Sequence, residues 1–202
     1  MFDSYLKESI IGRAIKAKKI SIKFYNPWDF CPKKKRVDGR PYGGGPGMVL
    51  RPEFVIKAVE RVLKNSKIKP LIINFVPSAE KFSTALAKKF AKKYKDIILI
   101  SGRYEGIDAR VDKILKTKKI SVGDYVLTGG EVPAMILIDS ISRQVPGVLG
   151  KYESLEEERV SSSVVYTRPE VLKYRGKNYR VPKVLLSGNH KKIDEWKNKH
   201  NK

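Results

Sequence analysis

The sequence contains one cysteine, Cys31, so it cannot form a disulfide within the chain. A lone cysteine in a lysine-rich chain of 202 residues is typical of a protein from the reducing cytoplasm. No catalytic-cysteine motif surrounds Cys31, which is therefore interpreted as a small buried hydrophobic residue. The two histidines, His190 and His200, lie in a lysine-rich tail without zinc-ligand spacing. The residues alone predict no metal site.

Long apolar runs are also missing. No run reaches the roughly 18 residues that a membrane-spanning helix requires. The first ten residues, MFDSYLKESI, lack the apolar core of a signal peptide. We therefore expect a cytoplasmic protein with no membrane partner.

Acidic residues are scarce relative to basic ones. The chain has 21 Asp plus Glu against 43 Lys plus Arg, a formal charge of +22. This excess predicts a polyanionic partner whose binding weakens as salt rises. Nucleic acid is favoured over a membrane surface because the lysines are spread along the chain and no basic amphipathic helix with a bulky apolar face is present. Apolar residues make up 41% of the chain, which is enough for a core.

The apolar periodicity predicts alternating helices and strands, and therefore an α/β fold with a mostly parallel sheet flanked by helices. The character of the sequence changes after Gly150, where KYESLEEER carries a dense acidic cluster. This change predicts one domain at 1–150 and a second segment at 151–202. The expected helices cover 4–18, a stretch opening at Pro52, a stretch opening at Pro77, a short stretch after Gly106, and 131–143, and the expected strands cover 20–25, 71–76, 96–101 and 120–128.

Three glycine- or proline-containing turns follow the predicted parallel strands, at 76–78, 102–106 and 128–130. Ligands of parallel sheets bind beyond the carboxyl ends of the strands, and glycine lets a flat ligand approach the backbone. None of the turns matches GxGxxG or GxxxxGK[ST], which argues against a Rossmann dinucleotide site and a P-loop NTPase. The long glycine-rich segment PYGGGPGM at 41–48 is either a functional loop or a linker, and Tyr42 and Met48 argue against a linker.

Isolated charged residues mark further candidates. Arg143 ends an apolar helix and can either form a structural salt bridge or bind a phosphate or developing oxyanion. Asp124 is either a turn residue or a ligand contact. Ser154 and Glu157 fit a capping box, whereas a carboxylate of the same string could act as a general base.

Five strings in order resemble the bacterial tRNA (guanine-N1)-methyltransferases of the TrmD family: PYGGGPGM, GRYEGID, SVGDYVLTGGEVPAM, SRQVPGVLG and YTRPEVL. The resemblance extends over residues 2–196. It implies a SPOUT-type fold with a trefoil knot in the C-terminal half and an obligate homodimer. The implied reaction is S-adenosyl-L-methionine-dependent methylation of guanosine N1 at tRNA position 37.

The resemblance also implies roles for particular residues. Glu158 matches the general base and Arg143 the arginine that stabilises O6 of guanine, and Mg²⁺ is implied as an assisting ion. The implied substrate-binding residues are Tyr42, Gly43, Gly44, Gly45, Pro46, Gly47 and Arg103. The implied cofactor-binding residues are Phe75, Val76, Pro77, Ser78, Gly102, Tyr104, Glu105, Val122, Gly123, Tyr125, Leu127, Gly129, Gly130 and Pro133.

The chain departs from the family pattern in four places. The usual EEDSF string is EEERV here, so the base is glutamate, and a shortened insertion leaves Glu157 and Glu158 as alternatives. The usual SPQG turn is VPSA at 76–79. The family normally has a strand before the position of Phe2 and a helical tRNA-binding domain after that of Trp196, so 151–202 is expected to hold a linker-like segment and a remnant of that domain. These departures keep open a second hypothesis, a non-catalytic RNA-binding protein derived from a SPOUT methyltransferase.

Overall fold

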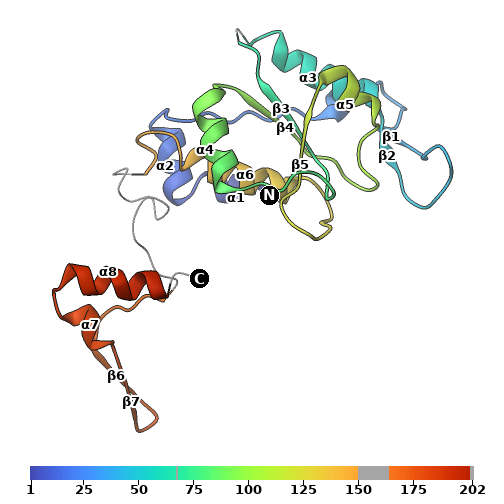
Figure 1. The fold of residues 1–202 in the computed structure, drawn as a ribbon. Coiled ribbons are helices and arrows are strands. Elements are labelled where there is room, and N and C mark those ends of the chain that lie inside the picture. Colours follow the sequence, from blue (N-terminus) through green and yellow to red (C-terminus); the bar gives the residue numbers. More distant parts are fainter. Residues whose placement is uncertain (67, 150–163, 201–202) are drawn as a thin grey trace. The chain divides into compact units, whose positions relative to one another are not determined.

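The computed structural model describes residues 1–66, 68–149 and 164–200, and the chain divides into two compact units, Met1–Val148 and Leu149–Lys202 (Figure 1). In the described part of the first unit, three parallel strands form a sheet: β3 (Leu71–Phe75), β4 (Ile97–Ile100) and β5 (Lys118–Ile120). Their order is β4-β3-β5, with Ile73 of the central strand opposite both Leu99 and Lys118. The predicted α/β fold with a parallel sheet is therefore confirmed.

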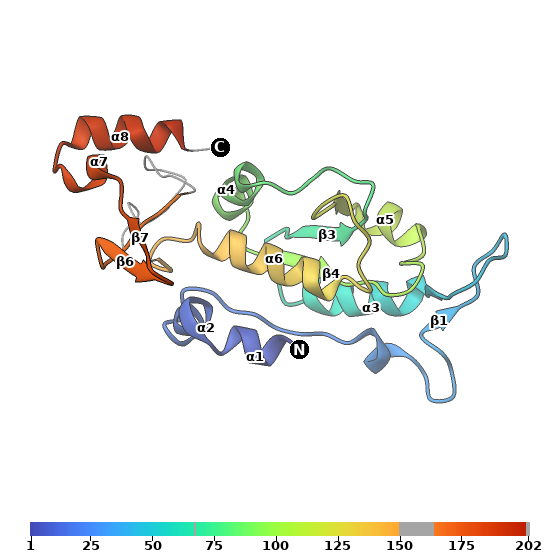
Figure 2. The same cartoon turned by 90° about the horizontal axis from the view of Figure 1, so that it is seen from below.

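Helices cover both faces of this sheet, as Figure 2 shows. On one face lie α3 (Pro52–Leu63) and α5 (Arg110–Leu115), and on the other lie α4 (Thr84–Lys93) and α6 (Glu131–Ser142). The order of the strands explains this arrangement. The chain crosses from β3 to β4 through α4 and then back past β3 to β5 through α5, and right-handed crossovers in opposite directions place their helices on opposite faces.

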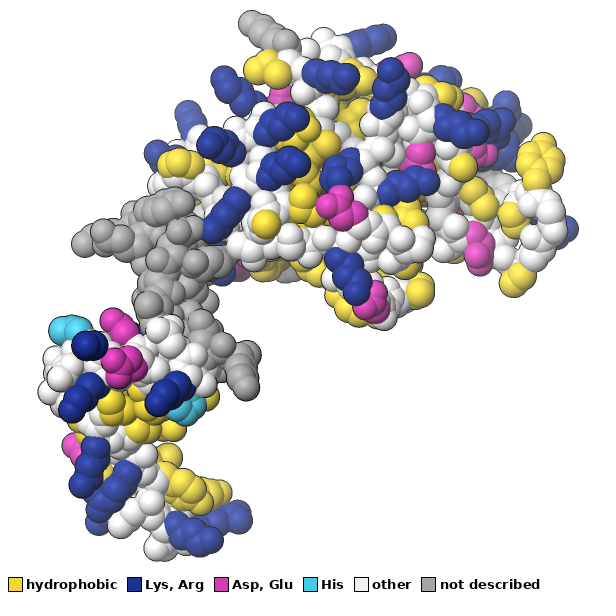
Figure 3. Space-filling model, viewed as in Figure 1, with side chains coloured by type: hydrophobic (Ala, Val, Ile, Leu, Met, Phe, Trp, Pro, Cys, Tyr) yellow, Lys and Arg dark blue, Asp and Glu magenta, His cyan; other side chains and the backbone are white. Residues whose placement is uncertain are grey.

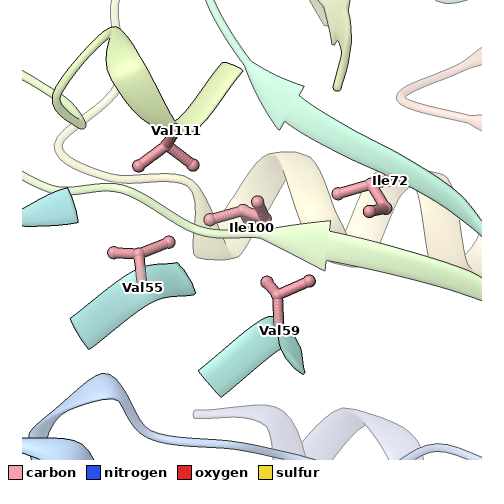
Figure 4. Packing of buried hydrophobic residues seen from close by; sticks show 5 residues of the cluster. All are labelled: Val55, Val59, Ile72, Ile100 and Val111. Atoms are coloured by element: carbon pink, nitrogen blue, oxygen red, sulfur yellow. The ribbon is translucent and has the colours of Figure 1, made fainter. Parts of the chain in front are cut away.

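The core follows the period of two along β3. Ile72 faces α3 and α5, where it packs with Val55, Val59, Ile100 and Val111 (Figure 4). Its neighbours Leu71 and Ile73 face the other way, and the cluster on that side also contains Phe90, Ile120 and Leu137. A strand buried on both faces is a continuous apolar run, which is why LIINF was recognisable from the sequence. Phe82, Leu86, Phe90 and Tyr94 recur every fourth residue in the sequence, which predicts one buried row. Phe90 belongs to the second cluster, and the other three pack against it.

The N-terminal segment differs from its prediction. The helix expected over 4–18 is two helices, α1 (Phe2–Leu6) and α2 (Ser9–Lys16), because Ser9 has a left-handed φ of 49°. The strand expected over 20–25 is wrong, since this segment belongs to none of the sheets in the described residues. An alternating pattern supplies one apolar face, but a strand also needs a neighbouring edge for its backbone groups. The segment leads into a short 3-10 helix, η1 (Pro27–Phe30), which lies against α3.

Two further boundaries and one facing direction are corrected. The helix expected from Pro77 begins at Thr84, where the Ser83 side chain accepts a hydrogen bond from the Leu86 amide and caps it. The strand expected over 120–128 ends at Ile120, and the next ten residues form a loop. The apolar spacing of the short helix after Gly106 also predicts that Ile114 faces inward, but Ile114 is 59% exposed.

The glycine-rich segment connects two short antiparallel strands, β1 (Asp38–Gly39) and β2 (Val49–Leu50). The Arg51 guanidinium donates a hydrogen bond of 3.0 Å to the Asp38 carbonyl, and Arg36 forms an ion pair of 2.8 Å with the Asp38 carboxylate. The Arg36 side chain also donates a hydrogen bond to the Asp38 carboxylate within this ion pair. That bond lowers the pKa of Asp38, although burial acts in the opposite direction. The segment is therefore a loop held at both ends and not a linker.

The described part of the second unit contains a hairpin and two helices. The hairpin pairs β6 (Val171–Tyr174) with β7 (Lys177–Arg180), and the helices are α7 (Lys183–Leu186) and α8 (His190–Lys199). Trp196 of α8 contacts Tyr166 and stacks on His200.

Candidate active site

Three loops leave the same edge of the sheet, because β3, β4 and β5 are parallel. They comprise residues 76–83, 101–109 and 121–130. In open α/β sheets this edge is the usual place for a ligand, particularly where the crossover direction reverses, as it does at β3. All of the predicted cofactor-binding residues lie in these loops, except Phe75 at the end of β3 and Pro133 in the first turn of α6.

Backbone hydrogen bonds join the first loop to the third. The Val76 amide donates to the Ile120 carbonyl at 3.0 Å and the Phe82 amide to the Ser121 carbonyl at 2.7 Å. In return, the Ser121 amide donates to the Glu80 carbonyl at 2.9 Å. Side chains add to this connection, since Lys81 forms an ion pair with Asp124. Asp124, which the sequence left open as a turn residue or a ligand contact, therefore contacts Lys81.

The second loop is joined to the third at two glycines. The Gly130 amide donates a hydrogen bond of 2.8 Å to the Gly102 carbonyl, and the Ser101 hydroxyl donates one of 3.0 Å to the Gly130 carbonyl. A Cβ at Gly130 would lie 2.6 Å from Ser101 Cα. Only glycine permits this approach, so the second glycine of the Gly129-Gly130 pair is explained by contact between two backbones.

An ion pair extends the same junction to α6. Arg103 Nε donates a hydrogen bond of 2.7 Å to Glu131 Oε1, and this contact raises the pKa of Arg103. Ser101 and Glu131 were not among the predicted site residues. Their signal in the sequence is weak, because they differ from other polar residues only in lying at the end of a strand and the start of a helix.

The glycine-rich loop reaches the second of these loops. The Glu105 amide donates to the Met48 carbonyl at 3.1 Å, and the Leu50 amide donates to the Gly106 carbonyl at 3.0 Å. A Cβ at Gly47 would lie 2.6 Å from Glu105 Oε1, so the loop and the Glu105 side chain are in close contact. The predicted substrate loop and one predicted cofactor loop therefore lie in contact with each other.

The tip of the glycine-rich loop is open. Gly43, Gly44 and Gly45 have φ values of 87°, 82° and 106°, and a Cβ on any of them would meet no atom within 4 Å. Tyr42 beside them is fully exposed. An anchored loop with an exposed aromatic tip is suited to contact a large ligand.

Large side chains of the site loops are also exposed. Tyr104, with a left-handed φ of 58°, and Tyr125 are both more than half exposed. The Tyr125 hydroxyl donates to the Val122 carbonyl at 3.0 Å, and its ring covers Gly123 so that a Cβ there would collide with it. Val126 is 82% exposed. These apolar groups beside backbone turns are features of a small-molecule site that a ligand or partner covers.

The structure places one of the two predicted catalytic residues. Arg143 is the C-cap of α6, half-buried, and its amide donates to the Asp139 carbonyl at 3.1 Å. Glu158, its alternative Glu157, and Ser154 lie outside the described residues. Among residues 1–66, 68–149 and 164–200, no group of three His, Cys, Asp or Glu side chains could hold a metal ion. Over the same residues, no helix has the length and apolarity to span a membrane.

The fold and this edge define an α/β protein with glycine-containing turns at the carboxyl ends of its parallel strands, where ligands of open α/β sheets usually bind. The chain belongs to the family described as tRNA (Guanine-1)-methyltransferase TrmD, which it matches over residues 1–202. It is 45% identical to the tRNA (guanine-N(1)-)-methyltransferase of Clostridioides difficile, with 98% of this chain and 86% of that protein aligned. The enzymes of the same name from Carboxydothermus hydrogenoformans and Pseudoalteromonas atlantica are 45% and 41% identical over 98% of this chain and 78% and 75% of their own.

Proposed function

We propose that this protein transfers a methyl group from S-adenosylmethionine to N1 of guanosine in tRNA, at position 37. The observation that carries the proposal is that three glycine-containing loops are joined at one sheet edge and the glycine-rich loop is anchored to the same place, in a chain of the tRNA (guanine-1)-methyltransferase family. The formal charge of +22 suits a polyanionic substrate.

The residues present fit S-adenosylmethionine, which supplies an electrophilic methyl group when it is bound. The turn at 76–78, the turn at 102–105 and the loop at 122–130 present backbone N–H and C=O groups at one edge of the sheet. Gly130 allows two of these loops to lie against each other without a side chain between them. Such an edge can hydrogen-bond the edge of a flat adenine ring through its backbone alone, which is consistent with VPSA replacing the family's SPQG turn.

The substrate side needs a base and an anion-stabilising group. N1 of guanine carries a proton, so a carboxylate must remove it while negative charge develops on O6. We assign the first role to Glu158 and the second to Arg143, whose planar guanidinium carries hydrogen-bond donors suited to a developing oxyanion. Arg103, held by Glu131, and the open tip of the glycine-rich loop would position a guanosine turned out of its stack. Magnesium, if it assists, would take ligands from RNA phosphates besides any protein group.

We further propose that the protein acts as a homodimer. Apolar residues lie all around α6, and its Val132 remains exposed in the single chain. Val126 and Leu127, in the loop that precedes α6, are exposed as well. A second copy of the chain would cover these groups and complete the site. The trefoil knot remains a prediction from the resemblance, and the cytoplasmic location remains a prediction from the composition of the sequence.

One measurement tests the reaction. Purified protein is incubated with S-adenosylmethionine and tRNA transcripts carrying guanosine or adenosine at position 37, and methylated nucleosides are mapped by mass spectrometry. We expect 1-methylguanosine at position 37 of the first transcript and no methylation of the second. Equal methylation of both transcripts would contradict the proposal. Methylation of neither transcript, by protein that binds the cofactor in calorimetry, would also contradict it and would leave a non-catalytic RNA-binding protein as the function.

A further inference from the structure

The β6–β7 hairpin of the second unit exposes aromatic and basic side chains together. In Figure 3 the hairpin, labelled in Figure 1, carries both hydrophobic and Lys or Arg side chains at its surface. None of its ten residues is acidic, and four are basic: Lys173, Arg175, Lys177 and Arg180.

The register places the aromatic residues on one face. Leu172 lies opposite Tyr179, and Tyr174 lies opposite Lys177. Because residues directly opposite each other share a face, as do alternate residues along a strand, these four side chains form one surface. Leu172, Tyr174 and Tyr179 are each more than half exposed. Because more than half of each side chain is exposed, the two tyrosine rings are accessible for binding.

The tip of the hairpin has an unusual residue. The two-residue turn is Arg175-Gly176, with φ values of 46° and 73°. Such a turn prefers asparagine, aspartate or glycine at its first position, because other side chains are strained at positive φ. Arg175 occupies that position and its guanidinium lies 5.3 Å from the centre of the Tyr174 ring. An arginine strained at a position that favours glycine suggests a function for its side chain.

We propose that this hairpin is an RNA-binding element in which Tyr174 and Tyr179 stack on bases and Arg175 contacts phosphate. RNA is the occupant that fits, because the exposed face pairs aromatic rings with positive charge and the hairpin carries no carboxylate. The inference rests on the proposed tRNA substrate. It gives the tRNA a grip that is separate from the sheet edge where the cofactor would bind.

Substitution of Arg175 at the tip distinguishes an effect on tRNA affinity from an effect on hairpin stability. Arg175→Gly removes the guanidinium and relieves the strained φ, so the hairpin should keep or gain stability while tRNA affinity falls. Lys116→Gly is the matched control. Lys116 is also exposed and has a φ of 52°, and it precedes β5, so it lies at the amino ends of the parallel strands and not at the carboxyl ends where the cofactor would bind. Both variants lose one positive charge and replace a left-handed residue by glycine.

The measurement is fluorescence anisotropy of labelled tRNA with the full chain over a range of salt concentrations. We expect Arg175→Gly to reduce the salt slope by about 1 relative to wild type and to Lys116→Gly. Tyr179→Ala should weaken binding about 5- to 150-fold, the range for loss of one stacked base, whereas Tyr179→Phe should retain wild-type affinity.

Two results would overturn the inference. One is equal tRNA affinity and salt slope for Arg175→Gly and Lys116→Gly. The other is wild-type affinity in Tyr179→Ala with a lowered melting temperature, which would show that the face is covered by protein. These results are distinct from a failure of the proposed reaction. If the protein makes no 1-methylguanosine, the hairpin variants can still show whether the hairpin binds RNA. If the protein methylates tRNA but the hairpin variants bind RNA normally, only the inference about the hairpin is wrong.

Discussion

The backbone amide of Gly130 donates a hydrogen bond of 2.8 Å to the carbonyl oxygen of Gly102, which joins the loop before α6 to the loop after β4. Residues 28 positions apart are thereby held in backbone contact, and a Cβ at Gly130 would meet Ser101 Cα at 2.6 Å. The proposed cofactor site therefore depends on the distance between two backbones as well as on side chains. The first prediction follows from that distance.

Gly130→Ala is expected to weaken S-adenosylmethionine binding and to lower the free energy of unfolding by about 1–3 kcal/mol, the usual cost of forcing atoms into a packed region. Calorimetry and chemical denaturation measure the two effects. The control is Gly39→Ala, where the new Cβ would meet Arg51 Nε at an ordinary 3.5 Å. Wild-type cofactor affinity in Gly130→Ala would show that this junction does not shape the site.

Gly47→Ala is expected to impair tRNA methylation more than Gly44→Ala. Both residues have positive φ, 93° and 82°, so alanine costs a similar backbone strain of about 1–2 kcal/mol at each. Only at Gly47 does the added Cβ also meet Glu105, at 2.6 Å from Oε1. Steady-state methylation with varied tRNA should show the larger loss of kcat/KM for Gly47→Ala. Equal losses would indicate that contact with Glu105 is unimportant.

Glu158→Gln and Arg143→Ala are each expected to reduce methyl transfer by about 10²- to 10⁴-fold while leaving cofactor binding intact, because each removes a group that acts on guanine alone. Single-turnover assays with radiolabelled cofactor measure the rate. Glu157→Gln serves as the matched variant one residue away. If Glu157→Gln is slow and Glu158→Gln is not, the base is Glu157.

Asp112 is expected to make the stability of the first unit sensitive to acid. Burial raises its pKa, but hydrogen bonds from Thr117 and Asn74 and the ammonium of Lys119 together lower the pKa below its ordinary value. Lys119 Nζ lies 3.1 Å from Asp112 Oδ2. Since the carboxylate is favoured in the folded state, its stabilisation is present above the unfolded pKa of about 3.9 and is lost as pH falls through the folded pKa.

Denaturation of Asp112→Asn across pH tests this. The variant should be less stable than wild type at neutral pH, and the difference should shrink below about pH 4. Asp3→Asn is the control, because Asp3 pairs with Lys7 on an exposed surface, where ion pairs contribute little. A constant difference between Asp112→Asn and wild type at every pH would contradict the assigned role of the charge.

Elements whose signal is local were predictable. LIINF could be recognised as a strand because four of its five residues are apolar, and α3 could be recognised from Pro52 and the spacing of Phe54, Val55, Ala58 and Val59. Elements that depend on partners were not. The segment 20–25 alternates like a strand but has no neighbouring edge in the described residues. Residues 121–128 are apolar enough for a strand, yet Ser121 exchanges hydrogen bonds with Glu80 and Phe82 of the loop after β3, and the segment continues as a loop to Gly130.

By itself the sequence determined the fold class, the family and the polyanionic character of the partner, because these follow from periodicity, motif order and charge along one chain. Only the tertiary structure decided how the site is assembled. Gly102 and Gly130, Gly47 and Glu105, and Arg103 and Glu131 are far apart in sequence, and the parallel sheet brings each pair together at its carboxyl edge. The tertiary structure also showed that Arg175 occupies a strained turn, since a backbone angle is set by the strands that pair on either side of it.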